Sequence, residues 1–300
     1  MSLSNAVVSP QQISLRNVLV ATDFAAASSL PLLYALSLVR RYGATLYLAH
    51  VVRPDPLRRA DTASLRAVVD QAWREGQRLT TDLLVSGELR GVPHKLLIGE
   101  GEIWDGLAIM VQDNSIDLIV SGTRGRTGLS KMLFGSVAEQ IFRQAPCPVI
   151  TVGPNAAAPS GQALERILYA TDFTPQSLHA ASYALSLAQH YQARLWLLHV
   201  LAEGASAGPA SLAEEEARIR LTSIIGGAGK LAINAEVFAG RGAAGQQILH
   251  FAERQSAQLI VLGVTHPGQG PFAGRRWNVA SEVAGRAVCP VLTVRAPSGQ

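Results

Sequence analysis

The chain has 300 residues, of which 48% are hydrophobic and 16% charged, and its net charge is +4. This length predicts two domains with separate cores, and two cysteines exclude a framework of disulfide bonds. No apolar run reaches the roughly 18–20 residues of a membrane span, and the amino terminus lacks the pattern of a signal peptide. The basic residues are scattered along the chain. We therefore expect a cytoplasmic protein without a membrane or nucleic-acid partner.

In chain order, the first half of the sequence alternates between apolar strand patterns and helical patterns. Gly43 ends the first helix, and the second is expected to fray or break near Gly76. Alternating strands and helices predict a parallel sheet with right-handed crossovers, which is an α/β fold. Ligands bind such sheets at the carboxyl ends of the strands, where Asp23, Val51 and Gly122 lie. The expected strands are residues 17–21, 45–51, 93–98, 117–121 and 147–152, and the expected helices are residues 28–42, 61–89, 102–114 and about 136–144.

The second half of the chain repeats the first. The segment LVATDF at residues 19–24 returns as LYATDF at residues 168–173, and CPVITV returns as CPVLTV near the end of each half. Matches in register without a shared low-complexity bias indicate a tandem duplication. We therefore predict one domain at residues 1–153 and a second at residues 164–300, joined by a linker rich in Ala, Pro, Gly and Ser at residues 153–163.

A glycine-rich stretch, GTRGRTGLSKMLFGS at residues 122–136, lies between an apolar strand and a helix start. The backbone N–H groups and the helix dipole of such a loop favour phosphate oxygens. Gly122, Gly125 and Gly135 let a ligand approach the main chain, and Ser136 offers a hydroxyl at the expected N-cap. The alternative is a long polar loop whose glycines serve only its turns. Three basic side chains lie in or beside the stretch: Arg124, Arg126 and Lys131.

The spacing of this stretch, G-x2-G-x9-G-S, resembles the ATP-binding signature of the universal stress protein family. Residues 15–152 and 165–294 both resemble domains of that family. The resemblance implies two open, doubly wound parallel sheets of five strands in the order 3-2-1-4-5, a Rossmann-like fold of the adenine-nucleotide α-hydrolase type. It also implies ATP as the ligand, bound in the cleft between the first and fourth strands.

The resemblance further implies which residues of the first copy contact the nucleotide. Ala21, Thr22 and Asp23 would line the adenosine side, and Val51 would meet adenine through its backbone. The Asp23 carboxylate accepts hydrogen bonds, whereas hydroxyls and amides at the helix start donate them to phosphate oxygens. The residues implied around ribose and phosphates are Gly122, Gly125, Gly135, Ser136 and Val137, and Thr123 and Arg124 belong to the same nucleotide-binding set.

Several of these residues also have a purely structural interpretation. Asp23 and its twin Asp172 would then do no more than cap the helix that follows. His50 and His199 end equivalent strands, but no Ser or Cys nucleophile with an orienting acid pairs with them, so we expect structural histidines and no catalytic residues. The two cysteines occupy equivalent strand positions and are expected to be buried, reduced thiols: Cys147 and Cys289.

The second copy departs from the glycine signature. His266 stands where the second glycine is expected, and Trp277 and Asn278 replace Gly135 and Ser136. Bulk at the phosphate-facing turn predicts a weak, altered or empty second site, whose adenosine side survives without its phosphate side. Alternatively, Trp277 and the two arginines before it bind another anion or stack on a different ligand.

These observations predict an ATP-binding protein of stress response or regulation, with one functional nucleotide site in the first domain and unknown protein partners. We expect no enzyme beyond slow ATP hydrolysis, and no metal site other than Mg²⁺ carried by the phosphates. Two alternatives stay open, a slow ATP-hydrolysing enzyme and a ligand-free tandem scaffold. Pairing of the strands at residues 147–152 and 289–294 would make a pseudo-dimer within one chain, and two chains are expected to associate as a homodimer.

Overall fold

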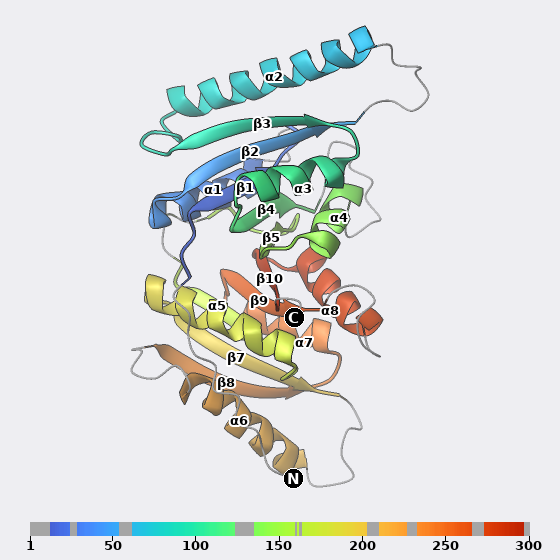
Figure 1. Cartoon of the computed structure of the whole chain (residues 1–300). Coiled ribbons are helices and arrows are strands. Elements are labelled where there is room, and N and C mark those ends of the chain that lie inside the picture. Colours follow the sequence, from blue (N-terminus) through green and yellow to red (C-terminus); the bar gives the residue numbers. More distant parts are fainter. Residues whose placement is uncertain are drawn as a thin grey trace. The chain divides into compact units, whose positions relative to one another are not determined.

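The chain forms two compact units, which we call the first and second domains (Figure 1). The first contains Ser14–Val152, and the second contains Ala163–Gln300 together with Gly153–Ala157. The computed structural model describes residues 13–24, 29–53, 62–123, 135–159, 161, 164–202, 210–226, 233–265 and 273–296.

The first domain holds five parallel strands in the order β3-β2-β1-β4-β5. Helices α3 and α4 pack on one face of these strands and α1 and α2 on the other, as a doubly wound sheet requires. The strands are β1 (Asn17–Ala21), β2 (Thr45–Val52), β3 (His94–Glu100), β4 (Leu118–Gly122) and β5 (Val149–Val152), and the helices are α1 (Ser29–Tyr42), α2 (Thr62–Val85), α3 (Ile103–Asp113) and α4 (Ser136–Gln144).

The second domain repeats this arrangement, with five parallel strands in the order β8-β7-β6-β9-β10. Read along each half of the chain, both orders are 3-2-1-4-5, so the expected α/β fold is confirmed. The strands are β6 (Arg166–Ala170), β7 (Arg194–Leu201), β8 (Asn234–Arg241), β9 (Leu259–Val264) and β10 (Val291–Arg295), and the helices are α5 (Pro175–Tyr191), α6 (Ala210–Gly226), α7 (Ala244–Arg254) and α8 (Ala273–Arg286).

Apolar side chains at sheet and helix spacing build the core. In β1 the three central residues are buried, and in α4 the buried residues Ala138, Ile141 and Phe142 lie three and four positions apart, on one side of the helix. Fully burying a side chain such as Phe142 stabilises the fold by about 1.5–3 kcal/mol. The core therefore holds the strands and α4 together directly beneath their carboxyl-end loops.

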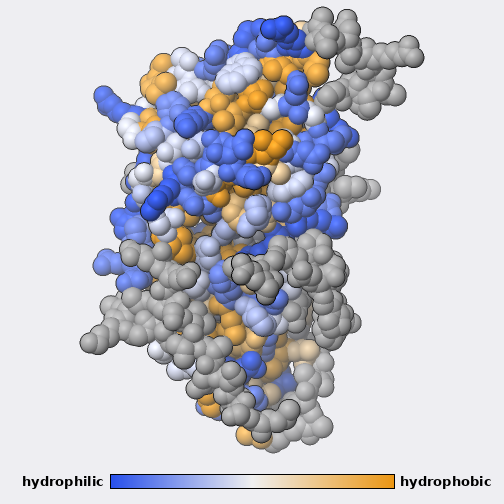
Figure 2. Space-filling model, viewed as in Figure 1, coloured by the Kyte–Doolittle hydropathy of each residue, from blue (hydrophilic) through white to orange (hydrophobic). Residues whose placement is uncertain are grey.

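Helix α2 corrects one expectation, because it runs unbroken from Thr62 to Val85 through Gly76. A Cβ atom at Gly76 would lie 2.8 Å from the Leu96 methyl carbons and 3.0 Å from Phe24 Cζ. The glycine thus serves the close packing of α2 on the sheet and does not break the helix. Figure 2 shows hydrophobic surface among hydrophilic residues where Figure 1 places α2 and β3. The exposed large apolar side chains of α2 are Val68, Trp73, Leu84 and Val85.

A polar clamp joins the amino ends of the first and fourth strands in the first domain. Asp117 Oδ2 accepts hydrogen bonds from the backbone N–H groups of Arg16 (2.7 Å) and Asn17 (2.8 Å). The Asn17 side chain in turn donates to the Ser115 carbonyl at 3.1 Å. Because the clamp fixes the starts of β1 and β4, it also fixes where their carboxyl ends lie.

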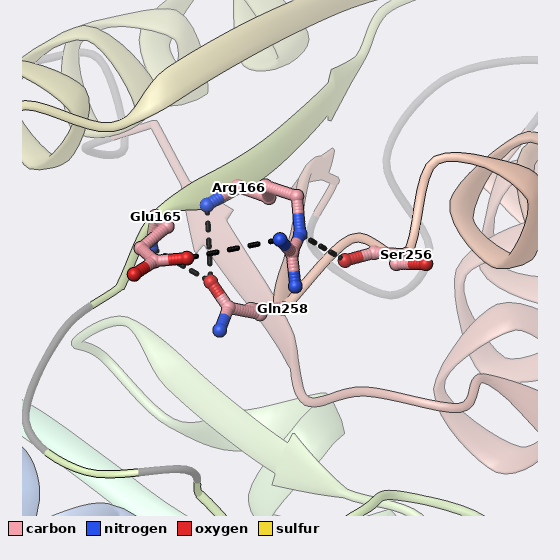
Figure 3. Close-up of polar contacts among 4 residues, drawn as sticks. All are labelled: Glu165, Arg166, Ser256 and Gln258. Carbon is pink, nitrogen blue, oxygen red and sulfur yellow. Dashed lines mark hydrogen bonds and ion pairs between the residues drawn. The ribbon is translucent and has the colours of Figure 1, made fainter.

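The second domain builds the same clamp from different side chains (Figure 3). Gln258 Oε1 accepts from the N–H groups of Glu165 (2.7 Å) and Arg166 (3.1 Å). The Arg166 guanidinium donates to the Ser256 carbonyl at 2.8 Å and lies 3.7 Å from the Glu165 carboxylate. The register between the first and fourth strands is therefore held alike in the two domains, although the residues differ.

Candidate functional site

The carboxyl end of β1 forms a tight turn. Ala21 pairs with Ala49 of β2 and Ser121 of β4, and the Thr22 N–H donates to the Ala49 carbonyl at 2.9 Å. Thr22 Oγ1 then accepts from the Phe24 N–H at 2.9 Å, while Phe24 adopts a left-handed φ of 58°, which is uncommon outside glycine. The turn places Asp23 where the strand leaves the sheet.

His50 holds this turn in place. Its Nδ1 lies 2.8 Å from the Thr22 carbonyl oxygen, and its ring lies against Phe24 with the centroids 4.9 Å apart. Because a carbonyl oxygen only accepts, Nδ1 carries the proton in this contact. The geometry supports the structural interpretation of His50.

The second domain repeats the turn and its histidine. His199 Nδ1 lies 2.8 Å from the Thr171 carbonyl oxygen, and Phe173 has a φ of 60°. The Phe173 ring lies between His199 (centroids 4.4 Å apart) and the Arg220 guanidinium (4.0 Å). Burial lowers the pKa of His199, and the hydrogen bond to the Thr171 carbonyl partly opposes this shift.

The two ends of the glycine stretch lie next to each other. The Thr123 N–H donates to the Val152 carbonyl at 3.1 Å, and the Gly135 N–H donates to the Thr123 carbonyl at 2.7 Å. Thr123 is only 1% exposed. The start of α4 is therefore held against the end of β4, while the predicted residues Arg124 and Gly125 lie outside the described residues.

The N-cap of α4 is Gly135, so the prediction of Ser136 at that position was wrong by one residue. Gly135 has φ −73° and ψ 159°, and its carbonyl accepts the Glu139 N–H at 2.9 Å. A glycine has no side chain with which to cap, and among the described residues no side-chain cap bond is present at this helix start. The N–H groups of Ser136, Val137 and Ala138 have no intrahelical acceptor there, and the helix dipole adds partial positive charge.

Apolar packing brings the other predicted residues together. Val51 is buried in a cluster with Leu107 and Met110 of α3, and Ala21 and Val137 pack against the same cluster. A Cβ atom at Gly106 would lie 3.0 Å from the Val51 methyl groups, so α3 lies close over the end of β2. Since the side chain of Val51 is in the core, its main chain is the part left for a ligand.

The second domain contains a cavity of about 200 Å³ at the corresponding place. Six of its lining residues are the repeat equivalents of predicted site residues in the first domain. They are Ala170, Thr171, Asp172, Val200, Gly263 and Val279, which match Ala21, Thr22, Asp23, Val51, Gly122 and Val137.

Sequence reasoning missed the helical residues that line this cavity. Ser177 comes from α5, Ala244 and Ile248 from α7, and Ala280 from α8. The apolar pair Ala244 and Ile248 is four residues apart, so the helical periodicity of α7 was the signal that pointed to them.

Comparison with known proteins identifies the family. A sequence model of the Universal stress protein family matches residues 14–153 and again residues 163–295. The chain belongs to the universal stress protein family. A universal stress protein of Mycolicibacterium smegmatis is 26% identical over 290 residues, which are 93% of this chain and 96% of that protein. One from Methanocaldococcus jannaschii is 26% identical over 149 residues, 49% of this chain and 88% of its own length.

A solved structure agrees with this assignment. The crystal structure of a universal stress protein from Archaeoglobus fulgidus superposes with a TM-score of 0.70 at 18% identity, covering 97% of this chain and 99% of that one. The tandem architecture of this universal stress protein is thus shared along its whole length.

The two domains of this universal stress protein differ at the helix after the glycine stretch. Helix α4 begins at Ser136, whereas α8 begins at Ala273, before Asn278, the repeat equivalent of Ser136. The amides of Asn278, Val279 and Ala280 therefore lie beyond the first turn and donate within the helix. The second domain lacks a helix start at the position where the first domain has one.

The aspartate of the second turn does not cap the next helix. The N-cap of α5 is Thr174, whose side chain accepts from the Ser177 N–H. Asp172 Oδ1 accepts from the Thr174 N–H (3.1 Å) and hydroxyl (2.6 Å). For Asp172 the capping interpretation was therefore wrong, because the carboxylate orients the residue that caps.

The two equivalent cysteines of this universal stress protein differ in burial. Cys289 is 3% exposed, and burial raises the pKa of its thiol to about 12. Cys147 is only partly buried, so the expectation of a buried thiol was wrong there. Cys147 borders a surface pocket together with Trp104 and Pro146, which accounts for its partial exposure.

Within the described ranges, no three His, Cys, Asp or Glu side chains gather as ligands for a metal ion. Over those same ranges, none of the helices combines the length and the hydropathy needed to span a bilayer.

Proposed function

We propose that this universal stress protein binds ATP at one site in its first domain and acts as a regulatory protein of the stress response. The observation that carries the proposal is the bond from the Gly135 N–H to the Thr123 carbonyl. It holds a helix start without a side-chain cap beside the carboxyl ends of the central strands, where anions are stabilised by main-chain donors and the helix dipole.

The adenosine part of the ligand is assigned to the turn after β1 and to β2. Asp23 supplies an acceptor for ribose hydroxyls, and the main chain of Val51 meets the adenine base, with Ala21 and Thr22 forming the wall between them. The close packing of Val51 under α3 supports this role, because it holds the side chain in the core and leaves the main chain for the base.

The phosphates are assigned to the glycine stretch and the first turn of α4. The Ser136 hydroxyl and the amides of Ser136 and Val137 donate to phosphate oxygens, with Gly135 allowing close approach. Mg²⁺ arrives with the phosphates and neutralises part of their charge. The remaining members of the proposed set are Gly122, Thr123, Arg124 and Gly125.

The protein acts by binding linkage and not by rapid turnover. ATP shifts the conformational population by the difference between its affinities for two states, and partner proteins respond to that shift. On this proposal any hydrolysis of ATP is slow.

Titration calorimetry with Mg-ATP on two variants at one position tests the site. Gly135→Trp places a large side chain at the helix start and is expected to weaken ATP binding at least 100-fold, which corresponds to about 2.7 kcal/mol. Gly135→Ala keeps the backbone geometry, since its φ is negative, and is expected to change the affinity only a few-fold.

Circular dichroism and thermal unfolding of both variants check that the fold is intact. Unchanged ATP affinity in folded Gly135→Trp would show that the site is assigned to the wrong residues. No ATP binding by the unmodified protein, and no rise of its melting temperature with ATP, would favour a ligand-free scaffold.

A further inference from the structure

We infer that the cavity of the second domain binds an uncharged purine nucleoside and rejects its phosphorylated forms. The inference rests on the proposed adenine nucleotide site of the first domain, because the equivalence of the two sites suggests the purine. The exclusion of phosphate rests on the second domain alone.

The wall of the cavity keeps the adenosine side of the repeat. Ala170 ends β6 and is followed by Thr171 and Asp172, Val200 lies near the carboxyl end of β7, and Val279 belongs to α8. Each has the same residue type at the equivalent place in the first domain. The duplication has therefore preserved the surface assigned to base and ribose.

The size and polarity of the cavity suit a small, flat and uncharged ligand. Its volume of about 200 Å³ is below the roughly 300–1,000 Å³ typical of pockets for drug-sized ligands. Most lining side chains are aliphatic, and Thr171 and Ser177 hydrogen bond to each other at 3.0 Å. Asp172 is exposed, and its carboxylate can accept hydrogen bonds from sugar hydroxyls, as proposed for Asp23 in the first domain.

The cavity is closed on one side by a close backbone contact. A Cβ atom at Gly263 would lie 2.3 Å from Ser177 Cα, so the end of β9 touches the first turn of α5 directly. Ser177 is buried and bonded to Thr174, and this wall is therefore formed before any ligand arrives.

The phosphate side of the repeat is missing because of where α8 begins. The amides that start α4 in the first domain correspond to amides inside α8, where they already donate to carbonyl groups of the preceding turn. Trp277, at the place of Gly135, is also part of this helix. Among the described residues, a phosphate at this position would lose its hydration without gaining the free N–H groups of a helix start.

The test is a calorimetric titration of adenosine into the full chain saturated with Mg-ATP, so that the first site is occupied. We expect one adenosine per chain. AMP in place of adenosine is expected to bind at least tenfold more weakly.

A matched pair of variants assigns this binding to one domain. Ala280 lines the cavity on α8, and Ala138 is its buried equivalent on α4. Ala280→Leu fills the cavity and is expected to weaken adenosine binding at least tenfold while ATP binding is unchanged. Ala138→Leu is expected to leave adenosine binding unchanged, and circular dichroism checks both folds.

The outcomes separate the inference from the proposed function. If the chain binds ATP at one site but binds no adenosine, the inference is wrong and the proposed function stands. Adenosine binding that Ala280→Leu removes, in a chain that binds no ATP, supports the inference and overturns the proposed ATP site. Equal affinities for adenosine and AMP, or adenosine binding that survives Ala280→Leu, overturn the inference.

Discussion

Gly263 shows how a single missing side chain shapes a site. It lies near the carboxyl end of β9, where the first turn of α5 approaches, and a Cβ atom would meet Ser177 Cα at 2.3 Å and the Gln176 carbonyl at 2.5 Å. Both contacts are with backbone, which has no rotamer that moves aside. The residue sets the distance between a strand and a helix across the cavity wall.

Gly263→Ala is accordingly expected to destabilise the protein. Overpacking of this kind typically costs about 1–3 kcal/mol, and urea unfolding measures it. Gly240→Ala is the matched control in β8, since a Cβ atom there meets nothing within 4 Å. Equal stability of the two variants would contradict the contact with Ser177.

At the scale of residues, the turns at the strand ends could be predicted from the sequence because the same motif occurs twice. Asp23 and Asp172 each follow Ala-Thr at the end of an apolar strand, and two copies of a motif restrict its position. The N-cap was missed by one residue, because Gly135 caps α4 without a side chain and the hydroxyl of Ser136 is the stronger signal. Ile248 and Ala280 were missed because the rotation of a helix about its axis decides which residues face a cavity.

At the scale of elements, the two domains differ most in the helix that follows the fourth strand. Alternation of apolar strands and amphipathic helices predicted the fold correctly, because the buried parallel strands are nearly continuous apolar runs. The early start of α8 was not predicted, since helix starts depend on which backbone amides find acceptors in the folded chain. This boundary distinguishes two otherwise equivalent sites.

Exchange of the segment between the fourth strand and this helix tests that distinction. Residues 123–135 of the first domain, placed between Gly263 and Asn278, are expected to create a second ATP site, because the adenosine-side residues are already present. Equilibrium dialysis should then find two ATP per chain. The reverse graft, residues 264–277 between Gly122 and Ser136, is expected to remove ATP binding. If neither graft changes the number of ATP molecules bound per chain, this segment does not determine phosphate binding.

At the scale of the whole molecule, the chain holds two universal stress protein domains, and we propose that the first alone binds ATP. Protein purified without added nucleotide is expected to carry about one ATP per chain, measured by chromatography after acid release. ATP at about 100 times its Kd should stabilise the folded state by roughly 2.7 kcal/mol, seen as a higher melting temperature. Two ATP per chain would show that the different starts of α4 and α8 do not restrict ATP to the first domain. Light scattering tests the expected homodimer.

The early start of α8 affects how ATP binding by the chain depends on the ATP concentration. With a helix start of this kind in one repeat and not in the other, one chain is expected to bind ATP along a single saturation curve, without the sigmoid that two coupled sites within the chain can produce. On the proposed function, ATP occupancy of the chain would then follow the ATP concentration hyperbolically, and a threshold response would have to come from contacts between chains or from partner proteins.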